Sequence, residues 1–324
     1  MSERELVLEG EALNAGFGAN HVLHDVDLRV GRGELHGIFG LNGAGKSVLL
    51  KVLAGLVPAW SGTVRLDGVD VTGMPTEERV AKGMGHVPQG RMVFADLTVE
   101  ENLRVGAYTS RRRDRAGYDQ RLARVYEQLP VLAEHRDALA GSLSGGQQAA
   151  LAVGRALVNE PRVLLIDEPS AGLAPIVVEQ LFSVLRDVAS ATGLTMVLVE
   201  QNVVFGLRLV DTAHLLQSGR IVYEGPVADL DRDRLAGLLG IGSMLHGTVG
   251  SVLESRRPAP PTARKPAAKK KAAAVAKKPA AKKKAAAVAK KPAAKKPATK
   301  KPATKKPAVK KATAKKTGAK KPAR

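Results

Sequence analysis

The sequence predicts an α/β protein with a mainly parallel sheet, antiparallel β additions, a helical subdomain and a disordered, basic C-terminal tail. Three observations support this prediction. Short apolar runs alternate with helical patterns along the chain, which is typical of a parallel sheet covered by helices. Residues 98–158 are mainly helical in pattern, with a charged, arginine-rich first part, and indicate the helical subdomain. Beyond Arg256 the chain consists almost entirely of Lys, Ala, Pro and Thr.

The N-terminal elements are predicted to be strands around one helix. Residues 5–35 alternate between apolar and polar side chains, and residues 34–39 (ELHGIF) form a short apolar strand. The string KSVLLKVLAGL that follows has helical spacing and ends near Gly55. Residues 61–71 contain Asp67-Gly68 between two short β patterns, which predicts a hairpin.

The C-terminal elements alternate between helix and strand. The string QQAALAVGRALVNE keeps its apolar residues on one face, so a helix should follow LSGG. VLLIDE (residues 163–168) is a buried parallel strand, followed by a helix over residues 175–191 and a strand over residues 194–200. A final hairpin turns at Ser218-Gly219.

Charge divides the chain into two parts. The net charge of +20 belongs entirely to the end of the chain, because residues 256–324 hold 27 Lys and Arg and no acidic residue. Residues 1–255 hold the other 24 basic residues and all 31 acidic ones, a net charge of −7. We predict a folded domain over residues 1–245 and a linker with a disordered tail over residues 246–324, since the tail cannot bury enough apolar surface to fold.

The expected compartment is the cytoplasm. The start, MSERELVLEG, has no apolar core of signal-peptide length. No run approaches the ~18 apolar residues that a membrane-spanning helix needs. The chain has no cysteine, which excludes disulfides and thiolate metal sites.

The string GLNGAGKS follows a predicted strand and opens a predicted helix, which is the context of a phosphate-binding loop and indicates a P-loop NTPase core. Glycines let backbone amides turn toward phosphate oxygens, the lysine reaches the β- and γ-phosphates, and the serine hydroxyl binds Mg²⁺. The predicted cofactors are therefore ATP and Mg²⁺. The predicted binding residues are Gly40, Asn42, Gly43, Gly45, Lys46 and Ser47.

Two adjacent acids end the strand VLLIDE. Asp167 is predicted to hold Mg²⁺, and Glu168 to orient and deprotonate the attacking water. The alternative is that Glu168 is an ordinary surface carboxylate at a strand end.

The string LSGGQQ is the most discriminating, because P-loop kinases and small GTPases do not need it. Ser144, Gly145 and Gly146 stand at a predicted helix start and form a second anion-binding terminus. The string lies 15 residues before VLLIDE. It has no role within its own nucleotide site and is explained only if it faces a second one.

Together these strings resemble the ATP-binding subunits of ABC transporters, from about Leu6 to Gly240. The resemblance implies that Phe17 stacks on adenine and that Gln89 senses the γ-phosphate and Mg²⁺. It also implies a dimer with an identical or similar subunit, in which LSGGQ of one subunit covers the ATP of the other. The loop SAGLAP (residues 170–175) would connect the two sites.

The strings VPQGRMVFADLTVEENL, DEPSAGLAP and LVEQN are similar to the ATPases of branched-chain amino acid importers and their amide and urea relatives. Most family members have a histidine where Gln201 falls, and this branch commonly has glutamine. The resemblance implies a γ-phosphate contact for Gln201, a separate membrane permease as partner, and a peripheral place on the inner face of the cell membrane. Val48 departs from the usual Ser or Thr without removing a catalytic group. The transported solute stays open.

The basic tail leaves alternatives open. It can serve solubility alone, bind nucleic acid without reading sequence, or contact anionic lipid. The competing function is a soluble ATPase associated with nucleic acid through this tail. Against it, the chain has neither a coiled-coil insertion nor a second ATPase domain.

Overall fold

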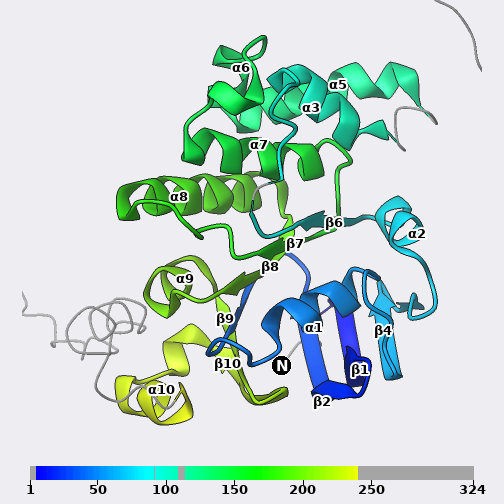
Figure 1. Cartoon of the computed structure of the whole chain (residues 1–324), viewed down its shortest axis with the longest axis vertical. Helices are drawn as coiled ribbons and strands as arrows, with labels where there is room; N and C mark the ends of the chain where they lie inside the picture. Colours follow the sequence, from blue (N-terminus) through cyan, green and yellow to red (C-terminus); the bar gives the residue numbers. More distant parts are fainter. Residues whose placement is uncertain (1–4, 91, 109–113, 240–324) are drawn as a thin grey trace, which may run out of the picture. The chain divides into compact units, whose positions relative to one another are not determined.

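The computed structural model describes residues 5–90, 92–108 and 114–239 (Figure 1). Within them the predicted fold class is confirmed: a mainly parallel sheet, an antiparallel sheet and a group of helices. The predicted tail, residues 246–324, lies outside the described residues. The domain boundary at residue 245 lies outside them too and stays a prediction.

The larger sheet has six strands in the order β10-β9-β3-β8-β7-β6. The four pairings from β9 to β6 are parallel, and only β10 runs antiparallel, at the edge beside β9. Strand order does not follow chain order, so helices must cross between the strands. The strands are β3 (Leu35–Phe39), β6 (Met84–Val87), β7 (Val163–Asp167), β8 (Thr195–Glu200), β9 (Thr212–Gln217) and β10 (Arg220–Pro226).

The smaller sheet is antiparallel and has the order β2-β1-β4-β5. The hairpin predicted at Asp67-Gly68 is confirmed, and both residues have positive φ, +49° and +72°. Positive φ at both central positions is what a type I′ hairpin turn requires. The strands of this sheet are β1 (Leu6–Phe17), β2 (Asn20–Gly31), β4 (Ser61–Leu66) and β5 (Val69–Asp70).

The parallel strands are buried on both faces, which explains why their sequences are continuous apolar runs. In β7, Leu164 and Ile166 contribute to the core shared with the helices. The alternate residues, Val163 and Leu165, contribute to the core between the two sheets, together with β1 and β2. Asp167 ends this strand with 2% of its surface exposed, so the acid at its carboxyl end is held by a rigid, fully packed element.

The helices follow the apolar periodicity of the sequence, and α3, α5, α6 and α7 form the upper group in Figure 1. All three individually predicted helices are confirmed: the helix after the phosphate loop is α1, the helix after LSGG is α7, and the helix predicted over residues 175–191 is α8. The helices are α1 (Lys46–Leu53), α2 (Thr76–Ala81), α3 (Val99–Gly106), α5 (Arg115–Gln128), α6 (Pro130–Glu134), α7 (Gly145–Leu157), α8 (Pro175–Thr192), α9 (Val203–Leu209) and α10 (Arg232–Leu239).

Capping boxes fix the starts of α3 and α7. Thr98 accepts a hydrogen bond from the backbone N–H of Glu101, whose carboxylate accepts one from the N–H of Thr98. Ser144 and Gln147 make the same reciprocal pair at α7. Each box satisfies two N–H groups that a helix start leaves without partners.

The sequence patterns missed α2, β6, α9 and α10. Arg79 shows why α2 matters, because its buried guanidinium donates to the carbonyl oxygens of Val52 and Leu53 at the end of α1. It also donates to Met74 and Thr72. This one side chain therefore supplies partners for orphan carbonyls at the helix that follows the phosphate loop. None of the helices in the described ranges is both long and apolar enough to cross a membrane.

Candidate nucleotide site

The phosphate loop joins β3 to α1, as predicted. Gly43 and Gly45 have φ values of +78° and +105°, which are accessible to glycine and strained for other residues. The turn between β9 and β10 holds the loop from outside. The N–H of Gly219 donates to the carbonyl of Ala44 at 3.0 Å, and the N–H of His24 donates to the carbonyl of Gly219 at 2.9 Å. Gly40 directly follows β3, and Asn42 lies exposed in the loop.

Lys46 lies almost fully buried within the loop that it follows. Its ammonium donates to the carbonyl oxygens of Gly40 at 3.0 Å and Leu41 at 3.2 Å. Burial lowers the pKa of Lys46, and the nearby carboxylates of Glu168 and Asp167 oppose that shift. The loop therefore holds a cation among inward-turned backbone, with acidic groups facing it.

Ser47 and Asp167 come together from segments far apart in the chain. The Ser47 hydroxyl donates to Asp167 Oδ1 at 3.1 Å. Burial raises the pKa of Asp167, and the bond from Ser47 works against that increase. A hydroxyl and a carboxylate are hard oxygen donors of the kind that Mg²⁺ uses beside nucleotide phosphates. These two residues fit the predicted metal position.

Glu168 lies beside Gln89, which follows β6. The Gln89 amide donates to Glu168 Oε2 at 2.7 Å. Glu168 itself has a φ of +45°, unusual for a residue with a side chain, and its N–H donates to the carbonyl of Val199 at 2.9 Å. Backbone strain of this kind persists where the surroundings fix it, often at functional sites. The geometry argues against the alternative of an unconstrained surface carboxylate.

The remaining predicted residues occupy different places. Gln201 is exposed and directly follows β8, the strand between β3 and β7. Phe17 ends β1 with 54% of its surface exposed. It stands near the turn into β2, and Val22 and Leu23 of that strand lie against Gly45 of the phosphate loop. Their roles toward γ-phosphate and adenine stay predictions.

Ser144, Gly145 and Gly146 belong to a different part of the molecule. Ser144 is the N-cap of α7, and the two glycines are its first residues, as predicted. Strands β6, β7 and β8 lie between α1 and α7 in Figure 1. The candidate site is therefore divided between a core that carries the phosphate loop and a helix terminus outside it.

One acidic residue of this region was missed. Glu200 is the last residue of β8 and is 1% exposed, and its two carboxylate oxygens accept hydrogen bonds from Ser170. A signal was available, because LTMVLVE ends an apolar run with an acid just as VLLIDE does.

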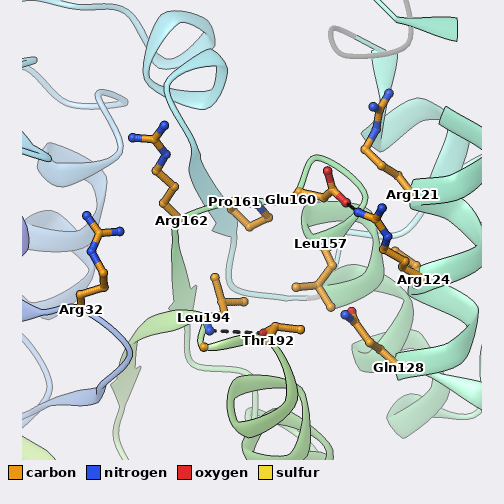
Figure 2. A pocket seen from close by; sticks show the side chains of 12 residues that line it. Arg32, Arg121, Arg124, Gln128, Leu157, Glu160, Pro161, Arg162, Thr192 and Leu194 are labelled. Carbon is orange, nitrogen blue, oxygen red and sulfur yellow. Dashed lines mark hydrogen bonds and ion pairs between the residues drawn. The ribbon is translucent and has the colours of Figure 1, made fainter. Parts of the chain in front are cut away.

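A cavity of about 340 Å³ lies elsewhere, at the amino ends of the parallel strands (Figure 2). Arg124 pairs with Glu160 at its wall. Arg32 and Arg162, which also line the cavity, both pair with Asp67. These pairs neutralise much of the local charge, and ligands of open parallel sheets bind at the carboxyl ends of the strands. The phosphate loop is therefore the better candidate for the site.

Comparison with known proteins agrees with this geometry. A family model described as ABC transporter matches residues 23–171. The high-affinity branched-chain amino acid transport ATP-binding protein BraG of Pseudomonas aeruginosa is 42% identical over 216 residues, 67% of this chain and 91% of that protein. The probable branched-chain amino acid transport ATP-binding protein LivF of Archaeoglobus fulgidus is 40% identical over 218 residues, again 67% and 91%.

Solved structures give the same result. The chain resembles a nucleotide-free ATP-binding cassette from an ABC transporter with a TM-score of 0.63 and 27% identity, covering 72% of this chain and 95% of that one. It resembles the ADP conformation of a further cassette with a TM-score of 0.61 and 29% identity, covering 68% and 91%. The chain therefore belongs to the ABC transporter family, as one of its ATP-binding, ATP-hydrolysing subunits.

Proposed function

We propose that this chain powers an importer for branched-chain or related amino acids, acting on a separate membrane permease from the inner face of the cell membrane. Two relatives with this transport function in their names are 42% and 40% identical to it. The string LVEQN, with Gln201 in place of histidine, supports the same branch. The subunit supplies energy and the permease binds the solute.

The catalytic part of this proposal rests on one observation: two side-chain pairs, Ser47 with Asp167 and Gln89 with Glu168, lie next to each other. In this proposal Lys46 and the loop amides bind the phosphates, and Ser47, Gln89 and Asp167 hold Mg²⁺. The metal would neutralise charge on the phosphate oxygens when bound. Glu168 accepts a proton from the attacking water.

Gln201 replaces a histidine that could carry charge. Its amide can donate a hydrogen bond to a γ-phosphate oxygen without contributing a positive charge. We propose that it positions the terminal phosphate, while Phe17 stacks on the adenine and Asn42, in the phosphate loop, lies beside the phosphates.

The active unit in this proposal is a dimer with a second ATP-binding subunit. The first turn of α7 offers the backbone N–H groups of Gly145 and Gly146 and the positive end of a helix dipole. Ser144, Gly145 and Gly146 would present this terminus to ATP held by the partner. Each site would then be completed by both subunits.

The tail would act outside the nucleotide site. Residues 256–324 carry 27 positive charges and no aromatic residue, so they can bind polyanions by charge and not by stacking on bases. Beside a membrane, each basic residue near anionic lipid adds about 1 kcal/mol. The same tail would anchor a nucleic-acid-associated ATPase, which is the second candidate function.

Copurification tests the two candidates directly. Full-length protein with an affinity tag, extracted from its own cells in mild detergent, should bring down a multi-span permease, identified by mass spectrometry. The purified complex in vesicles should then couple ATP turnover to uptake of leucine, isoleucine or valine. Recovery of nucleic acid that nuclease treatment removes, with no membrane protein, would favour the second function instead.

A further inference from the structure

Glu200 has no role in the proposed catalysis, yet its carboxylate is bonded to Ser170. Its Oε1 accepts a hydrogen bond from the Ser170 N–H at 3.0 Å, and its Oε2 accepts one from the Ser170 hydroxyl at 2.8 Å. Burial raises the pKa of Glu200, and these bonds from Ser170 oppose the increase. Because both oxygens accept, the arrangement suits the ionised carboxylate.

The position of Glu200 in the sheet connects three functional segments. It pairs in register with Phe39, which precedes Gly40 of the phosphate loop. It is followed in the chain by Gln201. Ser170 stands two residues after Glu168 and begins the loop Ser170–Pro175.

The contact also joins segments that the backbone no longer holds together. The parallel ladder of β7 and β8 ends at the pair Asp167 and Val199, and the N–H of Glu168 donates to the carbonyl of Val199. Beyond that point the segments that follow β7 and β8 separate into loops. The bonds from Ser170 to Glu200 link those loops past the end of the sheet.

We propose that Glu200 is a positioning residue that couples Gln201 to the loop Ser170–Pro175, and so couples the nucleotide bound in one site to the composite site of the partner. This inference rests on the proposed function, with its dimer of ATP-binding subunits, and on the expectation from the family resemblance that this loop connects the two sites. Charge-assisted hydrogen bonds hold the two segments as one unit. A shift of Gln201 on contact with γ-phosphate therefore moves Ser170.

The principal test is Glu200→Gln in the full-length protein. The amide keeps the size of the side chain and removes its charge. Its NH₂ group cannot accept from the Ser170 hydroxyl and can at most donate to it, so the charge-assisted bond is lost. We expect kcat for ATP to fall about tenfold, the effect of one charge-assisted bond on the active arrangement. KM and the affinity of the monomer for a fluorescent ATP analogue should change little, while cooperativity in ATP should be lost.

Ser170 gives the matching half of a double-mutant cycle. Ser170→Ala removes the hydroxyl bond and should lower kcat in the same direction, and Ser170→Thr should restore it. The double variant Glu200→Gln with Ser170→Ala should be no worse than Glu200→Gln alone, because the two changes remove one interaction.

Thr195→Val is the control for loss of any buried hydrogen bond in β8. Thr195 is fully buried at the opposite end of the strand, and its hydroxyl accepts from the N–H of Gly33 at 2.8 Å. This variant should unfold at a lower temperature and keep both kcat and cooperativity. Thermal unfolding of every variant separates coupling from folding.

A second readout does not depend on turnover. On the Glu168→Gln background, ATP-driven dimerisation should require more ATP once Glu200→Gln is added. The inference fails if Glu200→Gln keeps wild-type kcat and cooperativity, if its effect and that of Ser170→Ala add fully, or if monomer ATP binding falls as much as turnover. Absence of ATP turnover and ATP-driven dimerisation in the wild type would instead refute the proposed function.

Discussion

Glu168 is the residue on which the proposed hydrolytic chemistry depends. Its backbone has positive φ, and its carboxylate accepts the amide of Gln89. The strand that it follows, β7, is buried on both sides. A group held in this way has little freedom to leave its position, so a change of its chemistry should affect turnover more than structure.

Replacing Glu168 with Gln should lower ATP turnover by about 10²- to 10⁴-fold, the usual contribution of a general base. ATP should still bind through Lys46 and Ser47, so a nucleotide-bound dimer should accumulate. Turnover and oligomeric mass with and without ATP measure both effects. Glu179→Gln is the control, since that exposed carboxylate pairs with Arg208 on a neighbouring helix. Turnover equal to wild type in Glu168→Gln would exclude the general-base role.

At the scale of single elements, the start of α7 combines a structural and a functional part. The hydroxyl of Ser144 caps the helix by accepting from the N–H of Gln147, and the predicted anion site is formed at the same helix end by Ser144, Gly145 and Gly146. α3 has the same capping box at Thr98 without the glycines. The two helix starts therefore allow the cap and the anion site to be separated by experiment.

Ser144→Arg should abolish hydrolysis and leave ATP binding to the monomer nearly unchanged, because the bulky cation blocks a terminus that serves the partner's nucleotide. It should also cost about 1 kcal/mol of stability through loss of the cap. Thr98→Ala should lose a similar amount, about 1 kcal/mol, and keep its turnover. Turnover assays, nucleotide titration and thermal unfolding report these changes. A large loss of ATP binding in monomeric Ser144→Arg would mean that this terminus acts within its own subunit.

The elements that the sequence predicted are those whose signals lie within a few neighbouring positions. Strong local signals identified β3, α1, the Asp67-Gly68 hairpin and the start of α7, because glycines, capping residues and apolar runs act over a few positions. Motifs also named Ser47, Asp167, Gln89 and Glu168, but the hydrogen bonds that pair Ser47 with Asp167 and Gln89 with Glu168 were seen only in the structure. Arg79 and Glu200 were missed because their partners are backbone groups and a serine that only tertiary structure brings near. The segments α2, β6, α9 and α10 are short, with little room for periodicity.

At the scale of the whole molecule, charge is separated along the chain. The first 255 residues have a net charge of −7, and the last 69 carry +27. The two hydrophobic clusters of the described domain are built from residues before position 240. Folding and polyanion binding should therefore depend on different parts of the sequence.

Removing all residues after Ser255 should leave thermal stability and ATP binding unchanged and abolish binding to DNA and anionic vesicles. If the tail binds DNA by releasing counterions, log affinity falls with log salt at about 0.9 per phosphate neutralised. About six contacts would cost roughly a thousandfold between 50 and 200 mM salt. Binding of full-length and shortened protein over a salt series measures this. Equal binding by both would leave the tail a role in solubility alone.

The turn between β9 and β10 has a consequence for biosynthesis. Gly219 bonds both to Ala44 in the phosphate loop and to His24 in β2, so residues from the early and late parts of the chain meet there. As the protein leaves the ribosome, the phosphate loop and α1 emerge long before this turn. The loop acquires its supporting bonds only when the last hairpin has been translated and has paired with β3. A nascent chain that stops before Gly219 lacks these bonds, so we expect tight ATP binding only once nearly the whole domain has been synthesised.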